Sequence, residues 1–179
     1  MRQSIVLAGA AMALAAAPVL LSPTAARAQA PTRIDIAIGK TDFISQVNPA
    51  TDFRLDVRSG LSLLPLMQRY FTLQPFLGVE ATTRDSFWGG AGLELDAHWG
   101  HWFISPTIAV GGYSRGQGKN LGSTLEFRTT AEAGWRFDNG LRVGMIFSHT
   151  SNANIVRINP GTEALLVSMQ VPVGALLGN

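Results

Sequence analysis

Hydrophobic and polar residues alternate along most of the chain, and this alternation recurs about eight times between short turn-like segments. A period of two residues is typical of β-strands that have one apolar face. It predicts strands over 32–41, 51–62, 71–81, 87–98, 101–113, 121–137, 140–151 and 162–173. Beyond the first thirty residues, no segment shows a convincing helical period or approaches the run of about 20 apolar residues needed for a membrane helix. The pattern therefore predicts an all-β protein.

The charged residues of the predicted strands gather on one strand face and the apolar residues on the other. The stretch 121–137 shows this division best, with one side formed by Leu125, Phe127, Ala131, Ala133, Trp135 and Phe137 and the other by Glu126, Arg128, Thr130, Glu132 and Arg136. Charges of both signs on one face can pair with each other inside a narrow lumen, while the apolar face contacts lipid. We therefore expect an eight-stranded antiparallel transmembrane β-barrel.

A soluble sandwich or lipocalin-like binder also alternates, but with its apolar face turned inward. Two features favour the membrane barrel. The predicted strands have ten or so residues, which suits a tilted membrane crossing better than the five or six residues usual in soluble sheets. The connections also alternate in length: 99–100 and 138–140 are tight, whereas 42–52, 114–120 and 152–161 are longer. Only the segment 63–70 fits a short turn poorly.

Connection lengths also orient the predicted barrel, because such barrels have short periplasmic turns and long outer loops. With both termini in the periplasm, the tight turns fall on the periplasmic side. Five aromatic residues then lie near the periplasmic strand ends and predict one aromatic girdle: Phe71, Trp99, Trp102, Trp135 and Phe137.

The N-terminus reads as an export signal. Arg2 precedes an apolar stretch over 5–21, and Ala26-Arg27-Ala28 places small residues where a signal peptidase reads them. A single membrane anchor is the alternative, but the stretch is short for a span. We predict a cleaved signal peptide over 1–28 and one outer-membrane barrel domain over 29–179.

Charge and cysteine content narrow the function classes. Removing Arg2 and Arg27 leaves 12 basic residues against 12 acidic ones, and no basic cluster with interleaved aromatics exists, so nucleic acid is not an expected partner. The chain has no cysteine, which excludes disulfides and thiolate chemistry.

The last predicted hairpin holds the residues with catalytic potential. His149 and Ser151 are two apart on one strand, so they share a face with Cα atoms about 6.5 Å apart. If the hairpin pairs symmetrically about Val156, Glu163 lies opposite His149 with Cβ atoms about 5 Å away. Serine, histidine and a carboxylate are the groups that nucleophilic ester hydrolysis uses. All three continue the apolar face of their strands, where polar groups are costly unless they have a role.

The same hairpin resembles the PagL family of outer-membrane lipid A 3-O-deacylases. The resemblance lies in the run His149-Thr150-Ser151-Asn152-Ala153, then Asn159-Pro160-Gly161 and Glu163, about 20 residues in which types and spacings match together. It implies an eight-stranded barrel whose Ser-His-Glu triad faces the outer leaflet of the bacterial outer membrane. It also implies hydrolysis of the 3-position ester of lipid A, the substrate within lipopolysaccharide, with no metal or other cofactor.

Carried over residue by residue, the resemblance implies Ser151 as nucleophile, His149 as general base and then acid, and Glu163 as the acid that orients His149. It implies Asn159 as the donor that stabilises the oxyanion, and Asn152 is either a second donor or a turn former. Outer-membrane lipid is an expected partner, and a homodimer is a further state that the sequence allows.

One other function stays open at this point. A non-catalytic structural or adhesive barrel would share the signal, strand count and girdle, but would give no reason for three triad residues to fall together. Residues in the predicted outer loops are candidates to contact the phosphates of lipid A, although such residues are ordinarily just solvated: Arg84, Arg115, Lys119 and Arg157. His98 and His101 flank a tight turn without a third metal ligand and read as interfacial.

Overall fold

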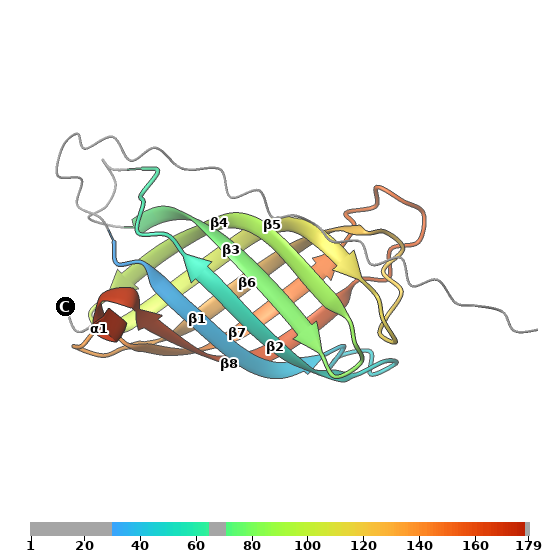
Figure 1. Cartoon of the computed structure of the whole chain (residues 1–179), viewed down its shortest axis with the longest axis horizontal. Coiled ribbons are helices and arrows are strands. Elements are labelled where there is room, and N and C mark those ends of the chain that lie inside the picture. The colour runs from blue at the N-terminus through green and yellow to red at the C-terminus, as the bar shows by residue number, and fades with distance from the viewer. Residues whose placement is uncertain (1–29, 65–70, 178–179) are drawn as a thin grey trace, which may run out of the picture.

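A computed structural model describes residues 30–64 and 71–177, which form a closed barrel of eight strands (Figure 1). The strands are β1 (Arg33–Thr41), β2 (Ala50–Arg58), β3 (Phe71–Thr82), β4 (Phe87–Trp99), β5 (Trp102–Ser114), β6 (Leu125–Arg136), β7 (Arg142–Ser151) and β8 (Thr162–Pro172). Each strand pairs antiparallel with the next, and β8 pairs antiparallel with β1. Closure gives every strand two neighbours and leaves no sheet edge. The predicted fold class is confirmed.

Strand boundaries agree with the alternation to within a few residues, with two larger differences. β2 ends at Arg58 instead of residue 62, and β6 begins at Leu125 instead of residue 121. The second difference has a local cause, because Gly122 has φ of +94°, a conformation that interrupts an extended strand. A short helix, α1 (Val173–Leu177), follows β8 and was not predicted. The predicted signal peptide lies outside the described residues, and so does most of the segment 63–70.

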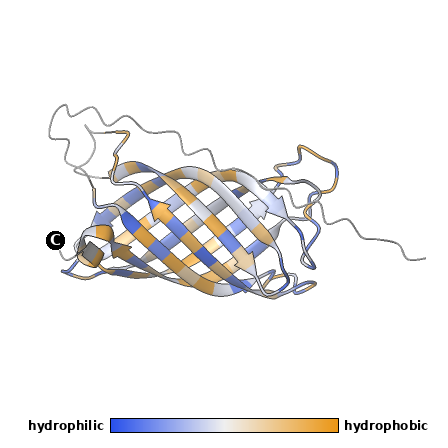
Figure 2. Ribbon diagram, viewed as in Figure 1, coloured by the Kyte–Doolittle hydropathy of each residue, from blue (hydrophilic) through white to orange (hydrophobic). Residues whose placement is uncertain are grey.

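The outer surface of the barrel is apolar, and Figure 2 shows the resulting chequered pattern along the strands. Alternate residues of each strand are exposed apolar side chains, as Val143, Met145 and Phe147 are on β7. The polar residues between them point into the lumen and are buried. The predicted division of the strand faces is therefore correct.

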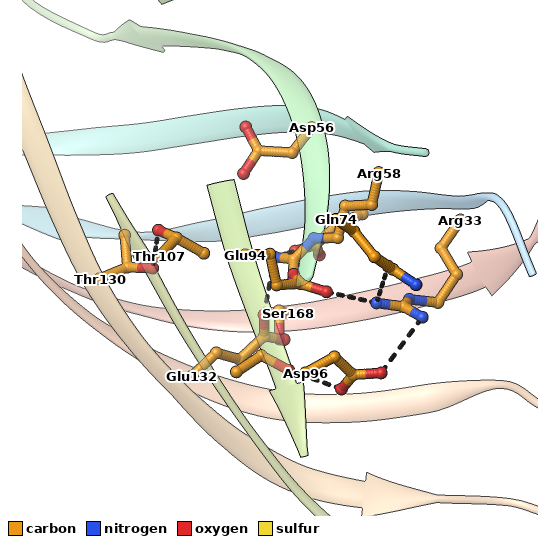
Figure 3. Close-up of polar contacts among 12 residues, drawn as sticks. Arg33, Asp56, Arg58, Gln74, Glu94, Asp96, Thr107, Thr130, Glu132 and Ser168 are labelled. Atoms are coloured by element: carbon orange, nitrogen blue, oxygen red, sulfur yellow. Dashed lines mark hydrogen bonds and ion pairs between the residues drawn. The ribbon is translucent and has the colours of Figure 1, made fainter. Parts of the chain in front are cut away.

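The lumen is filled by ion pairs (Figure 3). Arg58 contacts the carboxylates of Asp35, Glu94 and Glu132, which come from three other strands. Arg142 makes two hydrogen bonds to Asp96, of 2.7 and 3.0 Å. Such contacts join strands that are far apart in the sequence, so the charges hold the barrel together from within.

The lumen also contains apolar side chains, which alternation alone did not predict. Trp88 and Phe103 are fully buried there, and each lies against an arginine. The Arg128 guanidinium lies 4.1 Å from the centre of the Trp88 ring, and that of Arg142 lies 4.9 Å from the Phe103 ring. Aromatic faces attract such cations, so these residues fill space and still support the charge network.

The two ends of the barrel differ in their connections. One end, here called the turn end, carries the tight connections β4–β5 and β6–β7, the start of β1 and the end of β8 (Figure 1). The predicted aromatic girdle lies at this end: Trp99 pairs with Trp102, and the Trp102 and Trp135 rings are 5.1 Å apart. The opposite end, here called the loop end, carries the connections 42–49, 83–86, 115–124 and 152–161. Among the described residues, no helix is long and apolar enough to cross a membrane.

Candidate active site

His149 and Glu163 form a hydrogen-bonded pair on the outer surface near the loop end. They are direct partners in the β7–β8 ladder, as the symmetric hairpin predicts. The Nδ1 atom of His149 lies 3.3 Å from Oε1 of Glu163, and the two side chains are 43% and 23% exposed. A carboxylate bound to Nδ1 fixes that nitrogen as the protonated one, so Nε2 is left to act as a base.

Ser151 is the last residue of β7 and lies on the same strand face as His149. Its backbone pairs with Phe127 of β6, and its side chain is partly exposed. Ser151 and His149 both belong to the described residues, and Ser151 Oγ makes no hydrogen bond to the His149 imidazole. Catalytic hydrogen bonds are often long before substrate binds, so the shared face and the two-residue spacing are the informative features.

Gly161 contacts the His149 ring, a contact that the sequence did not predict. Its φ is +60°, and a Cβ atom added there would lie 2.6 Å from His149 Cε1 and 3.2 Å from Nε2. Only glycine has no Cβ to strike the ring and adopts this φ freely. The contact with the imidazole depends on how the hairpin folds back, so residue spacing alone could not predict it.

Asn159 and Asn152 join the two ends of the β7–β8 connection. Oδ1 of Asn159 accepts a hydrogen bond from the Asn152 backbone N–H at 3.1 Å, and its amide nitrogen donates to Asn154 Oδ1 at 3.0 Å. An asparagine amide has two N–H donors, and the contact with Asn154 uses one of them.

The Asn152 side chain is fully buried and donates to the carbonyls of Leu121 and Ile158, both at 2.8 Å. Both of its N–H donors are thereby used. Of the two interpretations of Asn152, this geometry favours the turn former.

The turn that follows Ser151 has an uncommon backbone. Ala153 and Asn154 both have positive φ, 53° and 62°, and the Ile155 N–H donates to the Asn152 carbonyl at 3.0 Å. Two central residues with positive φ are typical of a type I′ turn, and alanine adopts that conformation at some cost. The chain therefore turns sharply directly after Asn152, so β7 ends at Ser151 and this residue lies at the rim of the barrel.

Asp42 ties the neighbouring β1–β2 loop to Glu163. Its backbone N–H donates to the Glu163 carbonyl at 2.6 Å, and its carboxylate accepts from Lys119 Nζ at 2.6 Å and from the Asn48 N–H at 2.7 Å. Burial alone would raise the pKa of Asp42. The hydrogen bonds from Lys119, Ser45 and Asn48 outweigh that effect and lower the pKa to about 2. The backbone of Glu163 therefore has His149 of β7 as its neighbour on one side and Asp42 of the β1–β2 loop on the other.

The other candidate residues lie apart from this pair. Lys119 is held by Asp42, and Arg84 donates to the Pro49 carbonyl. His101 belongs to the turn end, where its ring stacks on Trp135 at 4.8 Å. A hollow at the loop end opens into the lumen instead, and its lining includes Glu80 and Tyr113 but neither His149 nor Ser151. The outer face is where the serine, the imidazole and the carboxylate come together.

Fold and site together define a class: a small closed barrel with an apolar outer surface that carries a serine, a histidine and a glutamate near its loop end. The profile of the family described as lipid A 3-O-deacylase (PagL) matches residues 42–172. The chain belongs to this family.

Individual proteins that are similar to this chain agree with the family assignment. Lipid A deacylase PagL of Pseudomonas aeruginosa is 37% identical over 73 residues, which are 40% of this chain and 42% of that relative, so the match spans less than half of its length. The crystal structure of the outer membrane enzyme PagL is similar in fold, with a TM-score of 0.61, 24% identity, and coverage of 78% of this chain and 99% of that one. A de novo designed transmembrane β-barrel gives a TM-score of 0.54 at 10% identity, covering 80% of this chain and 97% of that one.

Proposed function

We propose that this protein is a serine esterase of the outer membrane that removes the ester-linked 3-position hydroxyacyl chain of lipid A. One observation carries the proposal: in a member of this family, His149 is hydrogen-bonded to Glu163 on the outer face of the barrel, on the same strand face as Ser151. A structural barrel has no need for that arrangement, because polar side chains facing lipid are costly.

In the proposed mechanism, Ser151 Oγ attacks the ester carbonyl carbon while His149 Nε2 takes the hydroxyl proton. Glu163 holds the ring and stabilises the imidazolium charge. An amide N–H of Asn159 donates to the oxyanion of the tetrahedral intermediate. The intermediate collapses, the bond to the sugar oxygen breaks, and His149 returns the proton to that oxygen. Water, deprotonated by His149, then attacks the acyl-enzyme. The bond to Ser151 Oγ breaks, His149 returns the proton to that oxygen, and a free hydroxy fatty acid leaves.

The position of the residues supports a substrate that arrives through the membrane. They lie near the loop end of an apolar outer surface, and the loop end is the outer end in barrels of this kind. Lipid A in the outer leaflet would then reach Ser151 by lateral diffusion, with its ester groups near the level of the barrel rim.

Mass spectrometry of lipid A tests the proposal. Outer membranes carrying the wild-type protein or Ser151→Ala are compared, with Thr51→Ala as a matched control, because Thr51 carries a hydroxyl on the same outer surface two strands beyond β7–β8. We expect lipid A to lose one hydroxyacyl chain with wild type and Thr51→Ala but not with Ser151→Ala. Unmodified lipid A in all three samples, with folded barrel present, would instead favour a non-catalytic structural barrel.

A further inference from the structure

Large apolar side chains are exposed on two of the four loops at the loop end. Ile155 and Ile158 in the β7–β8 loop are 60% and 57% exposed, and Ile44 and Val47 in the β1–β2 loop are 61% and 79% exposed. Together with Val156, these residues are here called the apolar rim. Figure 2 shows apolar residues in the β7–β8 loop, which projects beyond the barrel wall.

The apolar rim belongs to two loops that are neighbours in the strand order of the closed barrel. The other two loops at this end, 83–86 and 115–124, expose polar residues such as Arg84, Asp85 and Arg115, and their large apolar residue Leu121 is buried. The two apolar loops are the ones that flank the candidate site. The β7–β8 loop connects Ser151 to Glu163, and the β1–β2 loop hydrogen-bonds to the Glu163 carbonyl through Asp42.

The exposure of the rim does not come from a loosely held loop. Below the β7–β8 rim residues, Asn152 binds the carbonyls of Leu121 and Ile158, and Asn159 binds the Asn152 backbone. Polar contacts hold the base of the loop while its isoleucines face outward. On the β1–β2 side, the Phe43 ring packs edge-on against Phe147, at 6.2 Å between centroids.

The apolar rim continues the surface that faces lipid. Phe147, Met145, Leu165 and Val167 form the exposed outer face of β7 and β8 directly below His149 and Glu163. The polar pair therefore lies between two apolar surfaces, the barrel wall below and the rim above. Arg157, exposed between Val156 and Ile158, adds a cation at the level where anionic lipid headgroups would lie.

We propose that the apolar rim inserts into the interface of the outer leaflet, at the boundary between headgroups and acyl chains, and so holds Ser151 at the depth of the ester bonds. The proposal rests on the proposed function for its location, and it names the partner of that site as the hydrocarbon of the surrounding lipid, not a second copy of this chain. Residues with apolar tips and an adjacent cation are typical of segments that lie in the membrane interface.

Site-directed fluorescence tests the insertion without using activity. The chain has no cysteine, so Ile155→Cys and Ile158→Cys each give a single labelling site for an environment-sensitive fluorophore. Arg115→Cys, in a polar loop at the same end, is the matched control. In phosphatidylcholine vesicles containing lipids with nitroxide-labelled acyl chains, we expect quenching at 155 and 158 to be several-fold stronger than at 115. Equal quenching at all three positions would overturn the proposal.

A dilution series separates lipid from a second barrel. If the label at 155 moves into an apolar environment only at high protein-to-lipid ratios, the rim is a contact between copies and the proposal is wrong. Constant quenching across the series supports insertion. Because quenching needs no substrate, this result stands whether or not lipid A is hydrolysed.

Kinetics with two substrates then show what the rim does for the site. Ile155→Ser with Ile158→Ser is expected to lower turnover of lipid A embedded in vesicles several-fold and to leave turnover of a short-chain, water-soluble ester unchanged. Ile155→Leu with Ile158→Leu should restore the vesicle rate. An equal loss on both substrates would show a distorted site instead of lost insertion, and would contradict the proposal.

Discussion

The barrel has two sets of polar side chains, one in its lumen and one on its outer surface, and they differ in almost every respect. The lumen set is large, buried and joined by ion pairs such as those of Arg58 with Asp35, Glu94 and Glu132. The outer set is small and partly exposed, with one hydrogen bond between His149 and Glu163 and a serine on the same face. Charged groups that neutralise one another across strands hold a structure together. Groups that keep an exposed nitrogen and a hydroxyl facing outward are available for chemistry.

Charge density is therefore a poor guide to the location of the active site in a narrow barrel. Most of the acidic and basic residues of the strands lie in the lumen, where substrate cannot reach them. The residues that indicate the active site are the few polar ones on the lipid-facing side of the strands, because placing them in lipid without a role would destabilise the protein.

Removing the nucleophile should have the largest effect. Ser151→Ala is expected to lower turnover of lipid A by about 10⁴- to 10⁶-fold, as loss of a triad serine does elsewhere, because no other group forms the acyl-enzyme. Stability should be unchanged, since this side chain is partly exposed. Product quantification by mass spectrometry gives the rate. Equal rates for Ser151→Ala and wild type would exclude a catalytic role for the polar residues of the outer surface.

Removing the charge that orients His149 should have the next largest effect. Glu163→Gln keeps the shape but offers an amide to Nδ1, which favours the wrong tautomer, and we expect a loss of about 10³- to 10⁴-fold in turnover. Glu163→Asp should recover part of the rate. If Glu163→Gln turned over lipid A at the wild-type rate, the carboxylate would have no role in orienting the ring.

A substitution in the lumen should lower the stability of the barrel and leave the turnover of lipid A unchanged. Glu94 is fully buried and contacts Arg33 and Arg58, so Glu94→Gln leaves two arginines short of a partner. Breaking a buried pair in this way costs about 3–5 kcal/mol. Urea unfolding in detergent micelles, followed by tryptophan fluorescence, measures the loss. Turnover by the folded fraction should match wild type, and a large drop in that turnover would mean that the two sets are coupled.

Asn159→Ala tests whether this residue stabilises the oxyanion or only holds the β7–β8 loop. If one of its amide N–H groups meets the oxyanion, turnover should fall by about 10²- to 10³-fold with little change in KM. Asn154→Ala removes the other partner of the amide and serves as the control for loop structure. Equal losses in the two variants would assign Asn159 to holding the loop.

The smallest expected effect concerns the loop that supports Glu163. The pKa of Asp42 is lowered from 3.8 to about 2, so ionised Asp42 stabilises the β1–β2 loop fully above about pH 4. That contribution is lost as the pH falls toward 2. Pepsin, which is active in this range, should cut at Phe43 increasingly as the pH drops, relative to the apolar residues 61–64 at the turn end. Asp42→Asn should abolish the pH dependence, and an unchanged dependence in that variant would exclude Asp42.

The fold could be predicted from the sequence because a period of two residues reports directly which face each side chain occupies. Arg54, Asp56 and Arg58 alternate with Phe53, Leu55 and Val57, and closure of eight such strands follows from the need to satisfy every strand edge. The pairing of His149 with Glu163 was also predictable, since hairpin register fixes it. The apolar side chains in the lumen were not, because Trp88 and Phe103 fill gaps that depend on three-dimensional packing.

Contacts made by the loops could not be predicted from the sequence either. Gly161 against the His149 ring, and Asp42 against the Glu163 carbonyl, join residues whose proximity depends on loop conformation and not on strand periodicity. The roles of Ser151, His149, Glu163 and Asn159 stay predictions until chemistry tests them.

Covalent labelling shows whether Ser151 is a nucleophile that His149 activates on the outer face. A long-chain alkyl fluorophosphonate is incubated with the folded protein in phosphatidylcholine vesicles, where attack by a serine oxygen forms an O–P bond and expels fluoride. Peptide mass spectrometry then locates the adduct. We expect an adduct on Ser151 in wild type and in Thr51→Ala, and none in His149→Ala. An adduct on another serine, or labelling of Ser151 that persists without His149, would contradict it.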